Sequence, residues 1–250
     1  MAVAFAPSIA CFGDCLTEAH DVSINAVIEE IEYFMDAYRP HSNSIVLPAL
    51  VEYYSVPEHF ALLVNQVLAS DSTVTVDESF IHPSGFDKIV LLAGRNFKLR
   101  VHNFHPTNVQ RPSENIHNHR WEFASSIVAG YFVADFYEED NEGDTERLHY
   151  TYHSETGMSC NGKANLRKVS TTINAKGSAY FLPADKFHSI VDISPNGAVS
   201  VMATGFANGL TTTVYAQEEQ QTGAESASCG LGMFTKEQLI ETLADIQARL

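Results

Sequence analysis

Cysteine is scarce in this sequence. The chain has four cysteines among 250 residues, Cys11, Cys15, Cys160 and Cys229, and no two of them form a Cys-x-x-Cys pair. A disulfide framework or an all-cysteine zinc site needs cysteines in regularly spaced sets, so neither is expected. This usage is typical of a reducing compartment, and we expect a cytoplasmic protein.

Positive charge and long apolar runs are also lacking. Lys and Arg total 15 against 31 Asp and Glu, so the formal net charge is −16. Nucleic-acid affinity depends on basic contacts to phosphates, and no basic cluster is present, so we expect no nucleic-acid partner. No apolar run reaches the roughly 18 residues that span a bilayer. The apolar start of the chain lacks a basic segment and contains Pro7, so neither a membrane partner nor a signal peptide is expected.

Apolar residues, in contrast, are plentiful enough for a sizeable core. The chain is 45% hydrophobic and 18% charged, which is the composition of a globular protein rather than a disordered one. Its length suits one large domain or two small ones.

The beginning of the chain, residues 1–72, is expected to form a helical extension packed on the remainder. Ser23 can cap a helix whose apolar residues recur every three or four positions, and Pro40 should end it. Ser55 and Glu58 match a capping box, which predicts a second helix after them.

The end of the chain has a similar pattern after a polar stretch. Residues 216–234 are mostly small and polar and are predicted to form a linker. Thr235 and Gln238 match a capping box, and a helix over 235–250 should present one apolar face, made of Leu239, Leu243 and Ile246. This face could pack on the barrel or on a second subunit, so the sequence allows a homodimer.

Between these helices, over residues 73–215, the hydrophobic period changes to two. β-branched and aromatic residues gather in short runs, at 73–77, 88–92, 96–104, 126–137, 147–153, 167–173, 178–182, 188–193, 198–204 and 210–215. Turn sequences such as HPSG, NGK and SPNG separate them. Many short strands with regular turns predict a mainly β fold, either a sandwich or a barrel.

Two histidines in this region carry a chemical signal. His117 and His119 are two positions apart, so on a strand they would point to the same face and could bind one metal ion as adjacent ligands. Trp121 and Phe123 continue that face with apolar surface, and Gly130 falls where a tight turn between two strands is expected.

A second segment could supply a third ligand. Gly177, Pro183 and His188 lie in a stretch that predicts a strand, a proline turn and a histidine at the start of the next strand. Two neighbouring side chains cannot enclose an ion, so a histidine from a distant strand is what a metal site at a barrel mouth would need.

Together the two segments resemble the two motifs of the cupin superfamily, over roughly residues 95–205. In the first motif, an H-x-H pair is followed by a Glu and a Gly, which correspond here to His117, His119, Glu122 and Gly130. The Gly that usually precedes H-x-H is missing. The resemblance implies a double-stranded β-helix, or jelly-roll barrel, around a metal site.

The second cupin motif is G-x5-P-x-G-x-x-H. Gly177, Pro183 and His188 match its spacing, and Asp185 stands where the family usually has Gly. The resemblance implies that His188 completes a metal site with the two histidines of the first motif.

Glu122 departs from the family pattern. It follows His119 by three residues rather than four, so strand alternation sends it to the opposite face unless a bulge intervenes. We therefore favour a three-histidine site over one with Glu122 as a fourth ligand.

A three-histidine set resembles the thiol dioxygenase branch of the cupins, which implies Fe(II) and O2. Zn, Ni and Cu also bind neutral imidazoles. Position 124, near which some cysteine dioxygenases carry a cross-linking cysteine, is Ala124, so no such cross-link is expected. The resemblance does not extend to the substrate.

Side chains that could hold a substrate follow from strand alternation. In segment 97–102 one face is apolar and the other basic, so Arg100 could bind a substrate carboxylate, as the Arg of the resembling dioxygenases does. The alternative for Arg100 is a place on a solvated face. Tyr180 and Tyr131 are candidate hydroxyl donors, with an ordinary role in the core as the alternative.

The sequence thus predicts a mononuclear non-haem Fe(II) dioxygenase that oxidises a small molecule with O2. Its expected metal ligands are His117, His119 and His188, and its expected catalytic residues are Arg100 and Tyr180. Two alternatives remain open. One is a Zn or Ni cupin that acts as an isomerase or lyase, and the other is a cupin that binds a small molecule without catalysis.

Overall fold

The computed structural model describes residues 23–70, 74–82, 84–106, 114–220, 222 and 232–250. The helices are α2 (Ile24–Ala37), α3 (Ser42–Tyr54), α4 (Pro57–Ala69), α5 (Val74–Glu78) and α7 (Lys236–Arg249). The strands are β1 (Phe80–His82), β2 (Phe86–Ala93), β3 (Lys98–Phe104), β4 (Ile116–His117), β5 (Trp121–Ala129), β6 (Tyr131–Glu139), β7 (Thr145–His153), β8 (Gly157–Ala175), β9 (Ala179–Leu182), β10 (Phe187–Ile193), β11 (Ala198–Ala207), β12 (Thr211–Ala216) and β13 (Gly232–Met233).

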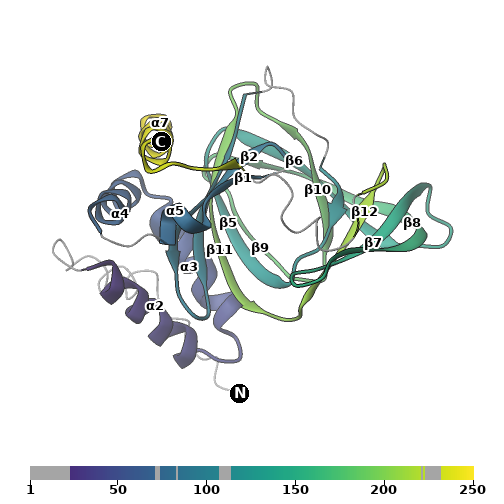
Figure 1. The fold of residues 1–250 in the computed structure, drawn as a ribbon, viewed down its shortest axis with the longest axis horizontal. Coiled ribbons are helices and arrows are strands. Elements are labelled where there is room, and N and C mark those ends of the chain that lie inside the picture. Colours follow the sequence, from purple (N-terminus) through teal and green to yellow (C-terminus); the bar gives the residue numbers. More distant parts are fainter. Residues whose placement is uncertain (1–22, 71–73, 83, 107–113, 221, 223–231) are drawn as a thin grey trace.

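The strands form two antiparallel sheets that face each other across a barrel, with the helices gathered on one side (Figure 1). The first sheet has the order β13-β1-β2-β3-β11-β5-β9. The second closes on itself in the order β10-β4-β12-β7-β8-β6, where β6 pairs back onto β10. The predicted fold class is confirmed: the chain is mainly β, with two antiparallel sheets that form a barrel and with helices before and after it.

The first sheet is buried on both faces. Its outer face packs under the helices in one apolar cluster, to which β3 contributes Leu99 and Val101 and helix α7 contributes Leu243. Its inner face meets the second sheet in another cluster, where Phe104 of β3 packs with Phe132 of β6. Alternate residues of one strand therefore serve two cores, since successive side chains of a strand point to opposite faces.

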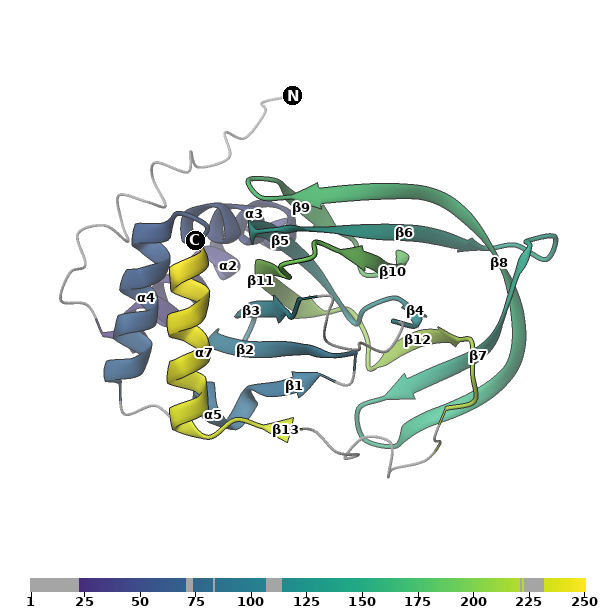
Figure 2. The same ribbon diagram turned by 90° about the horizontal axis from the view of Figure 1, so that it is seen from above.

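Helices α4 and α7 lie side by side although they are far apart in the sequence (Figure 2). Helix α7 begins with the predicted capping box of Thr235 and Gln238 and buries its predicted apolar residues, Leu239, Leu243 and Ile246. Among the described residues, no helix is long and apolar enough to cross a membrane.

Several local predictions were wrong. Residues 74–77, part of the run 73–77 expected in a strand, belong to helix α5, because a run this short has no decisive period and its packing on β2 decides. The NGK sequence at 161–163, expected to be a turn, lies within β8. Ser55 does not cap α4: its hydroxyl donates to the Glu52 carbonyl at 2.7 Å, and the N-cap residue is Val56. Part of the expected linker, Gly232–Met233, joins the first sheet by pairing with β1.

Candidate metal centre

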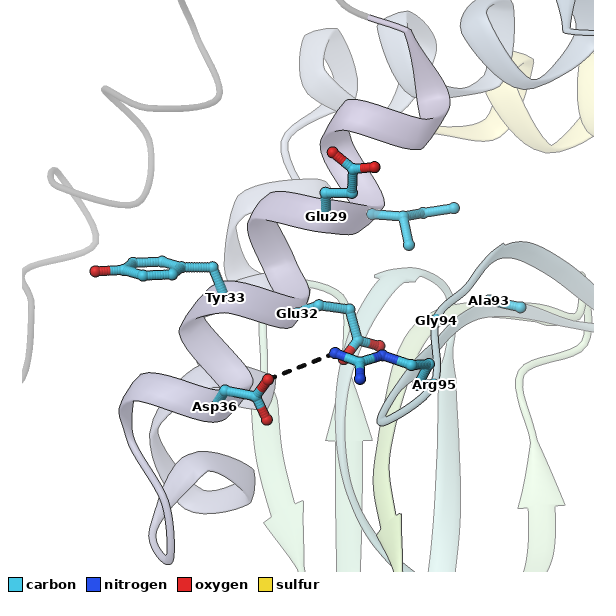
Figure 3. Close-up of a pocket in the computed structure, with 8 residues that line it drawn as sticks. Glu29, Glu32, Tyr33, Asp36, Ala93, Gly94 and Arg95 are labelled. Atoms are coloured by element: carbon cyan, nitrogen blue, oxygen red, sulfur yellow. Dashed lines mark hydrogen bonds and ion pairs between the residues drawn. The ribbon is translucent and has the colours of Figure 1, made fainter.

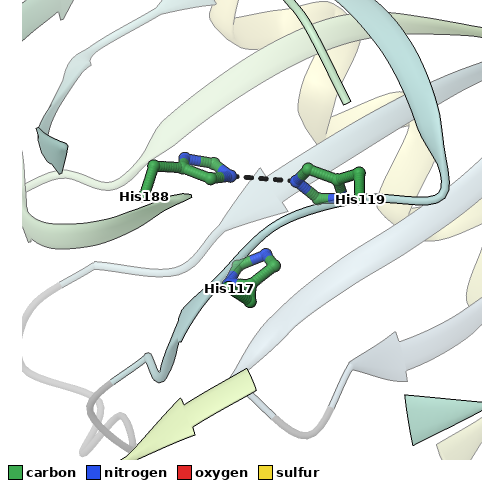
Figure 4. Close-up of side chains that lie close together, drawn as sticks. All are labelled: His117, His119 and His188. Carbon is green, nitrogen blue, oxygen red and sulfur yellow. Dashed lines mark hydrogen bonds between the residues drawn. The ribbon is translucent and has the colours of Figure 1, made fainter. Parts of the chain in front are cut away.

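Three histidines from distant parts of the sequence converge inside the barrel (Figure 4). His117 ends β4, His119 lies between β4 and β5, and His188 belongs to β10. Each offers a ring nitrogen, and these nitrogens all lie within 4.8 Å of one another. The ring centroids are 4.8 to 5.1 Å apart. The structure thus brings together the three histidines that the sequence predicts as metal ligands.

Strand pairing positions two of these histidines. His117 and His188 are direct partners in the antiparallel pair of β4 and β10. On its other edge β4 pairs with β12, where Val214 is the partner of His117. A residue paired on both sides by other strands has little backbone freedom. The Cα and Cβ atoms that carry the His117 ring are therefore well fixed.

His119 is positioned by a loop rather than a strand. The prediction that both histidines of the H-x-H pair lie on one strand was wrong, since β4 ends at His117. The amide of His119 donates to the carbonyl of Ala184 at 3.2 Å. Ala184 belongs to the proline turn before β10. A residue of the second motif therefore fixes the backbone of His119, which belongs to the first motif.

Contacts of the ring nitrogens are compatible with metal binding. The Nδ1–H of His117 donates to the carbonyl of Asn115 at 2.9 Å, which leaves Nε2 with its lone pair when the ring is neutral. The Nε2 atoms of His119 and His188 are 2.9 Å apart. Two imidazole nitrogens that bind one ion at about 2.1 Å lie roughly 3 Å apart when they meet at a right angle. The separation of the His119 and His188 nitrogens therefore fits two ligands of one cation, and the His117 ring lies beside them.

Burial keeps two of the three rings neutral. It lowers the pKa of His119 well below the usual value, and the charges of His117, His188 and Arg100 lower it further. Burial and His117 likewise lower the pKa of His188. Only the neutral imidazole has a lone pair for a metal, so these rings are available as ligands at neutral pH.

Aromatic side chains surround the histidines. The Phe123 ring lies edge-on to His119 with centroids 5.0 Å apart, and Phe136 stacks on His188 at 6.0 Å. Trp121 lies 6.2 Å from His119. Such surroundings limit the access of water, which strengthens electrostatic interactions at the centre.

Glu122 points away from the histidines, as strand alternation predicts. Its Oε2 accepts a hydrogen bond from the side-chain amide of Asn43 in α3 at 3.0 Å. The neighbouring Ala124 is buried on the same outer face, in the cluster under the helices. The three-histidine arrangement is therefore the one that the geometry favours.

Arg100 lies in the barrel interior, so the alternative of a solvated face is wrong. Its relative exposure is 6%, and its guanidinium lies over the Trp121 ring, 5.1 Å from the centroid. Burial, opposed by the charge of Glu78 and helped by that of Arg120, lowers the pKa of Arg100 to about 10. The guanidinium stays charged at neutral pH on the same side of the barrel as His119.

Tyr180 belongs to the same interior. Its ring packs edge-on against Phe123, with centroids 5.9 Å apart, and its hydroxyl is hydrogen-bonded to Ser125. Burial raises the pKa of Tyr180 above its ordinary value, so the hydroxyl remains protonated. A role as hydroxyl donor stays a prediction.

The sequence reasoning missed Lys88. It lies on β2 directly opposite His102 of β3, on the interior face of the sheet. The sequence does show Lys88 next to the apolar Ile89, as it shows Arg100 next to Val101. It does not show that β2 pairs with β3, and this pairing is what places Lys88 beside His102.

A surface pocket lies elsewhere, between α2 and the turn after β2 (Figure 3). Glu32 accepts hydrogen bonds there from the backbone and side-chain amides of Asn96, and Arg95 pairs with Asp36 at 3.5 Å. These polar groups form hydrogen bonds and ion pairs with one another. They therefore join helix α2 to the sheet and offer little to a ligand.

Comparison with known proteins assigns no family to the chain: no protein family and no curated protein matches its sequence. Solved structures overlap with parts of it. A hydroquinone 1,2-dioxygenase in complex with Cd2+ and 4-hydroxybenzonitrile gives a TM-score of 0.30 at 10% identity, over 46% of this chain and 61% of that chain. An RmlC-like cupin from Shewanella frigidimarina gives a TM-score of 0.31 at 15% identity, over 50% of this chain and 78% of that chain.

A Klebsiella pneumoniae protein with a double-stranded β-helix domain gives a TM-score of 0.32 at 16% identity, over 57% of this chain and 95% of that chain. The aligned part spans less than two thirds of the dioxygenase. Overlaps of this extent assign neither an activity nor a ligand to this chain.

Proposed function

We propose that this protein is a metal-dependent cupin enzyme that oxidises a small molecule with O2. His117, His119 and His188 bind one divalent cation, with Fe(II) as the first choice. The observation that carries this proposal is the convergence of three ring nitrogens within 4.8 Å of one another in partly buried, aromatic surroundings. The preference for iron and O2 comes from the resemblance of the two motifs to the thiol dioxygenase branch.

A cation with three protein ligands keeps open positions, which is typical of a catalytic rather than a structural site. When bound, the metal would supply Lewis acidity and redox chemistry toward O2. Neutral His119 and His188 hold it through lone pairs, and the Nδ1–H bond of His117 to the Asn115 carbonyl orients the third ring.

The remaining side chains bind and orient the substrate. Arg100 provides a planar fork of donors that suits a carboxylate, and Trp121 supports its guanidinium from one side. Phe123 and Phe136 exclude water from the histidines. Tyr180, protonated at neutral pH, offers a hydroxyl to a substrate oxygen.

Elemental analysis of anaerobically purified protein tests the metal site. We expect one iron per chain in the wild type and in His41→Ala, a control in which an exposed histidine outside the cluster is removed. The variants His117→Ala and His188→Ala should lose most of the metal. Metal content that is unchanged in both cluster variants would refute the proposal.

An oxygen electrode then separates oxygenase from other metal chemistry. Substrate-dependent O2 consumption is expected from the iron-loaded wild type. Turnover of the same substrate without O2 would favour the isomerase or lyase instead.

A further inference from the structure

Cationic and imidazole side chains line the interior face of β2 and β3 next to the histidine centre. Lys88 of β2 pairs in register with His102 of β3, and Arg100 lies two residues before His102 on the same face. This face also carries Phe86 and Phe104, which pack into the cluster between the two sheets. We refer to Lys88, Arg100 and His102 as the cationic face.

No described carboxylate pairs directly with the cationic face. No ion pair or hydrogen bond joins Lys88 or Arg100 to any described carboxylate, and Glu78, whose charge influences both, is paired with Lys98. The chain has 31 acidic residues. Arg100 is buried and Lys88 is half-buried, and cations withdrawn from water without a direct partner are unfavourable unless an anion is bound during function.

Several donors of this region also lack partners. The buried Nε of Arg100, Nε2 of His102 and Nε1 of Trp121 form no hydrogen bond in the described part of the chain. Buried polar groups are nearly always satisfied in folded proteins. Three unsatisfied nitrogens around one region, beside two cations, indicate a site that a polar, negatively charged ligand completes.

The two cations occupy separate positions. Arg100 lies over the Trp121 ring, whose other neighbours include His119. Lys88 places its Nζ over the Phe80 ring of β1, 4.4 Å from the centroid, towards the edge of the sheet. Burial and the charge of Arg100 lower the pKa of Lys88 to about 7, so an anion bound beside Lys88 would favour its charged form. Because the two side chains lie over different rings, a ligand with two acidic groups can contact both of them better than a ligand with one.

We propose that the substrate is a small dicarboxylate, with one carboxylate bound by Arg100 and Trp121 Nε1 and the other by Lys88 and His102. This inference rests on the proposed function for the statement that the ligand is the substrate. It adds a second anionic group to the single carboxylate expected at Arg100. The carboxylate at Arg100 lies nearer the histidines, and the one at Lys88 lies nearer β1.

Calorimetric titration of the purified, metal-loaded protein tests this inference with three probes. Succinate has two carboxylates, butyrate replaces one of them by a methyl group at the same chain length, and inorganic phosphate concentrates its charge in one group. We expect succinate to bind about tenfold or more tightly than butyrate, because a charge-assisted hydrogen bond supplies that difference. Phosphate should bind more weakly than succinate.

Matched variants assign the second carboxylate. Lys88→Met should abolish the preference for succinate while leaving butyrate affinity unchanged, and Arg100→Gln should weaken both ligands. Lys163→Met removes an exposed lysine that is paired with Glu146 and should change neither. If a variant fails to fold, the comparison of succinate, butyrate and phosphate binding to the wild type still tests the inference.

Absence of succinate binding, equal affinities for succinate and butyrate in the wild type, tighter binding of phosphate, or an unchanged preference in folded Lys88→Met would overturn the inference. Its failure is distinct from failure of the proposed function. Metal content reports on the three histidines, whereas the ratio of the succinate and butyrate affinities reports on the cationic face.

Discussion

His117 and His188 are direct partners across the antiparallel strands β4 and β10, and their ring centroids are 4.9 Å apart. One residue belongs to the first cupin-like motif and the other to the second. Their pairing means that the register of two strands, and not a flexible loop, sets the distance between these rings. Changes that disturb the register should therefore affect the centre even when they leave the histidines in place.

Gly130 occupies the turn between β5 and β6, where a larger residue does not fit. Its φ is +68°, and a Cβ at this position would lie 2.2 Å from the carbonyl oxygen of Gly197. Gly130→Ala should lower the free energy of unfolding by more than about 2 kcal/mol, since a left-handed backbone costs an L-residue about 1 kcal/mol before the clash is relieved. Urea denaturation measures this. Gly209→Ala, with nothing within 4 Å of the new Cβ, should change stability little, and equal effects of the two variants would contradict the argument.

Glu122 should not be needed for metal binding. Glu122→Gln keeps a carbonyl oxygen that can accept from Asn43 but removes the charge, so the metal content should equal that of the wild type. Glu122→Ala should lower the free energy of unfolding by about 1 kcal/mol through the lost hydrogen bond while also retaining the metal. Metal loss in the Gln variant would show that a fourth, carboxylate ligand had been overlooked.

Phe123 supports the centre by packing. Its relative exposure is 3%, and it contacts both His119 and Tyr180. Phe123→Ala should cost about 3–5 kcal/mol in free energy of unfolding because it leaves a cavity in the barrel. Ile173→Ala, at a side chain that is 72% exposed, serves as the control and should stay within about 0.5 kcal/mol. Comparable losses in chemical denaturation would argue against a packed interior at Phe123.

His105 should make a small, pH-dependent contribution to stability. Its hydrogen bond to Asp87 raises the pKa of His105, with Nε2 3.0 Å from the carboxylate. A raised pKa in the folded state stabilises the protein below the unfolded pKa of about 6.5, and the contribution is lost as the pH rises through the folded value. The side chain is 39% exposed, so solvent screening keeps the effect below about 1 kcal/mol.

The variant His105→Gln measures this contribution. Its loss of unfolding free energy relative to the wild type should be larger at pH 6 than at pH 8.5. An equal loss at the two pH values would mean that the His105–Asp87 contact contributes no charge-dependent stability.

Much of the site could be predicted from the sequence because its signals are local. Spacing identified His117, His119 and His188, and strand alternation predicted the direction of Glu122. The same alternation marked Arg100 as part of a basic face, but it could not say whether that face met solvent or the interior. Lys88 was missed for a related reason, since its importance comes from the pairing of β2 with β3.

By itself, the sequence determined the alternation of the strands, the capping of α7 and the residue types available for a metal, because these depend on neighbours within a few positions. Only the tertiary structure decided that His119 is held by the turn at Ala184, that residues 74–78 are helical and that Arg100 is buried against the Trp121 ring. The physical reason is that burial and pairing are set by segments far apart in the chain, whose free energies of contact outweigh local preference.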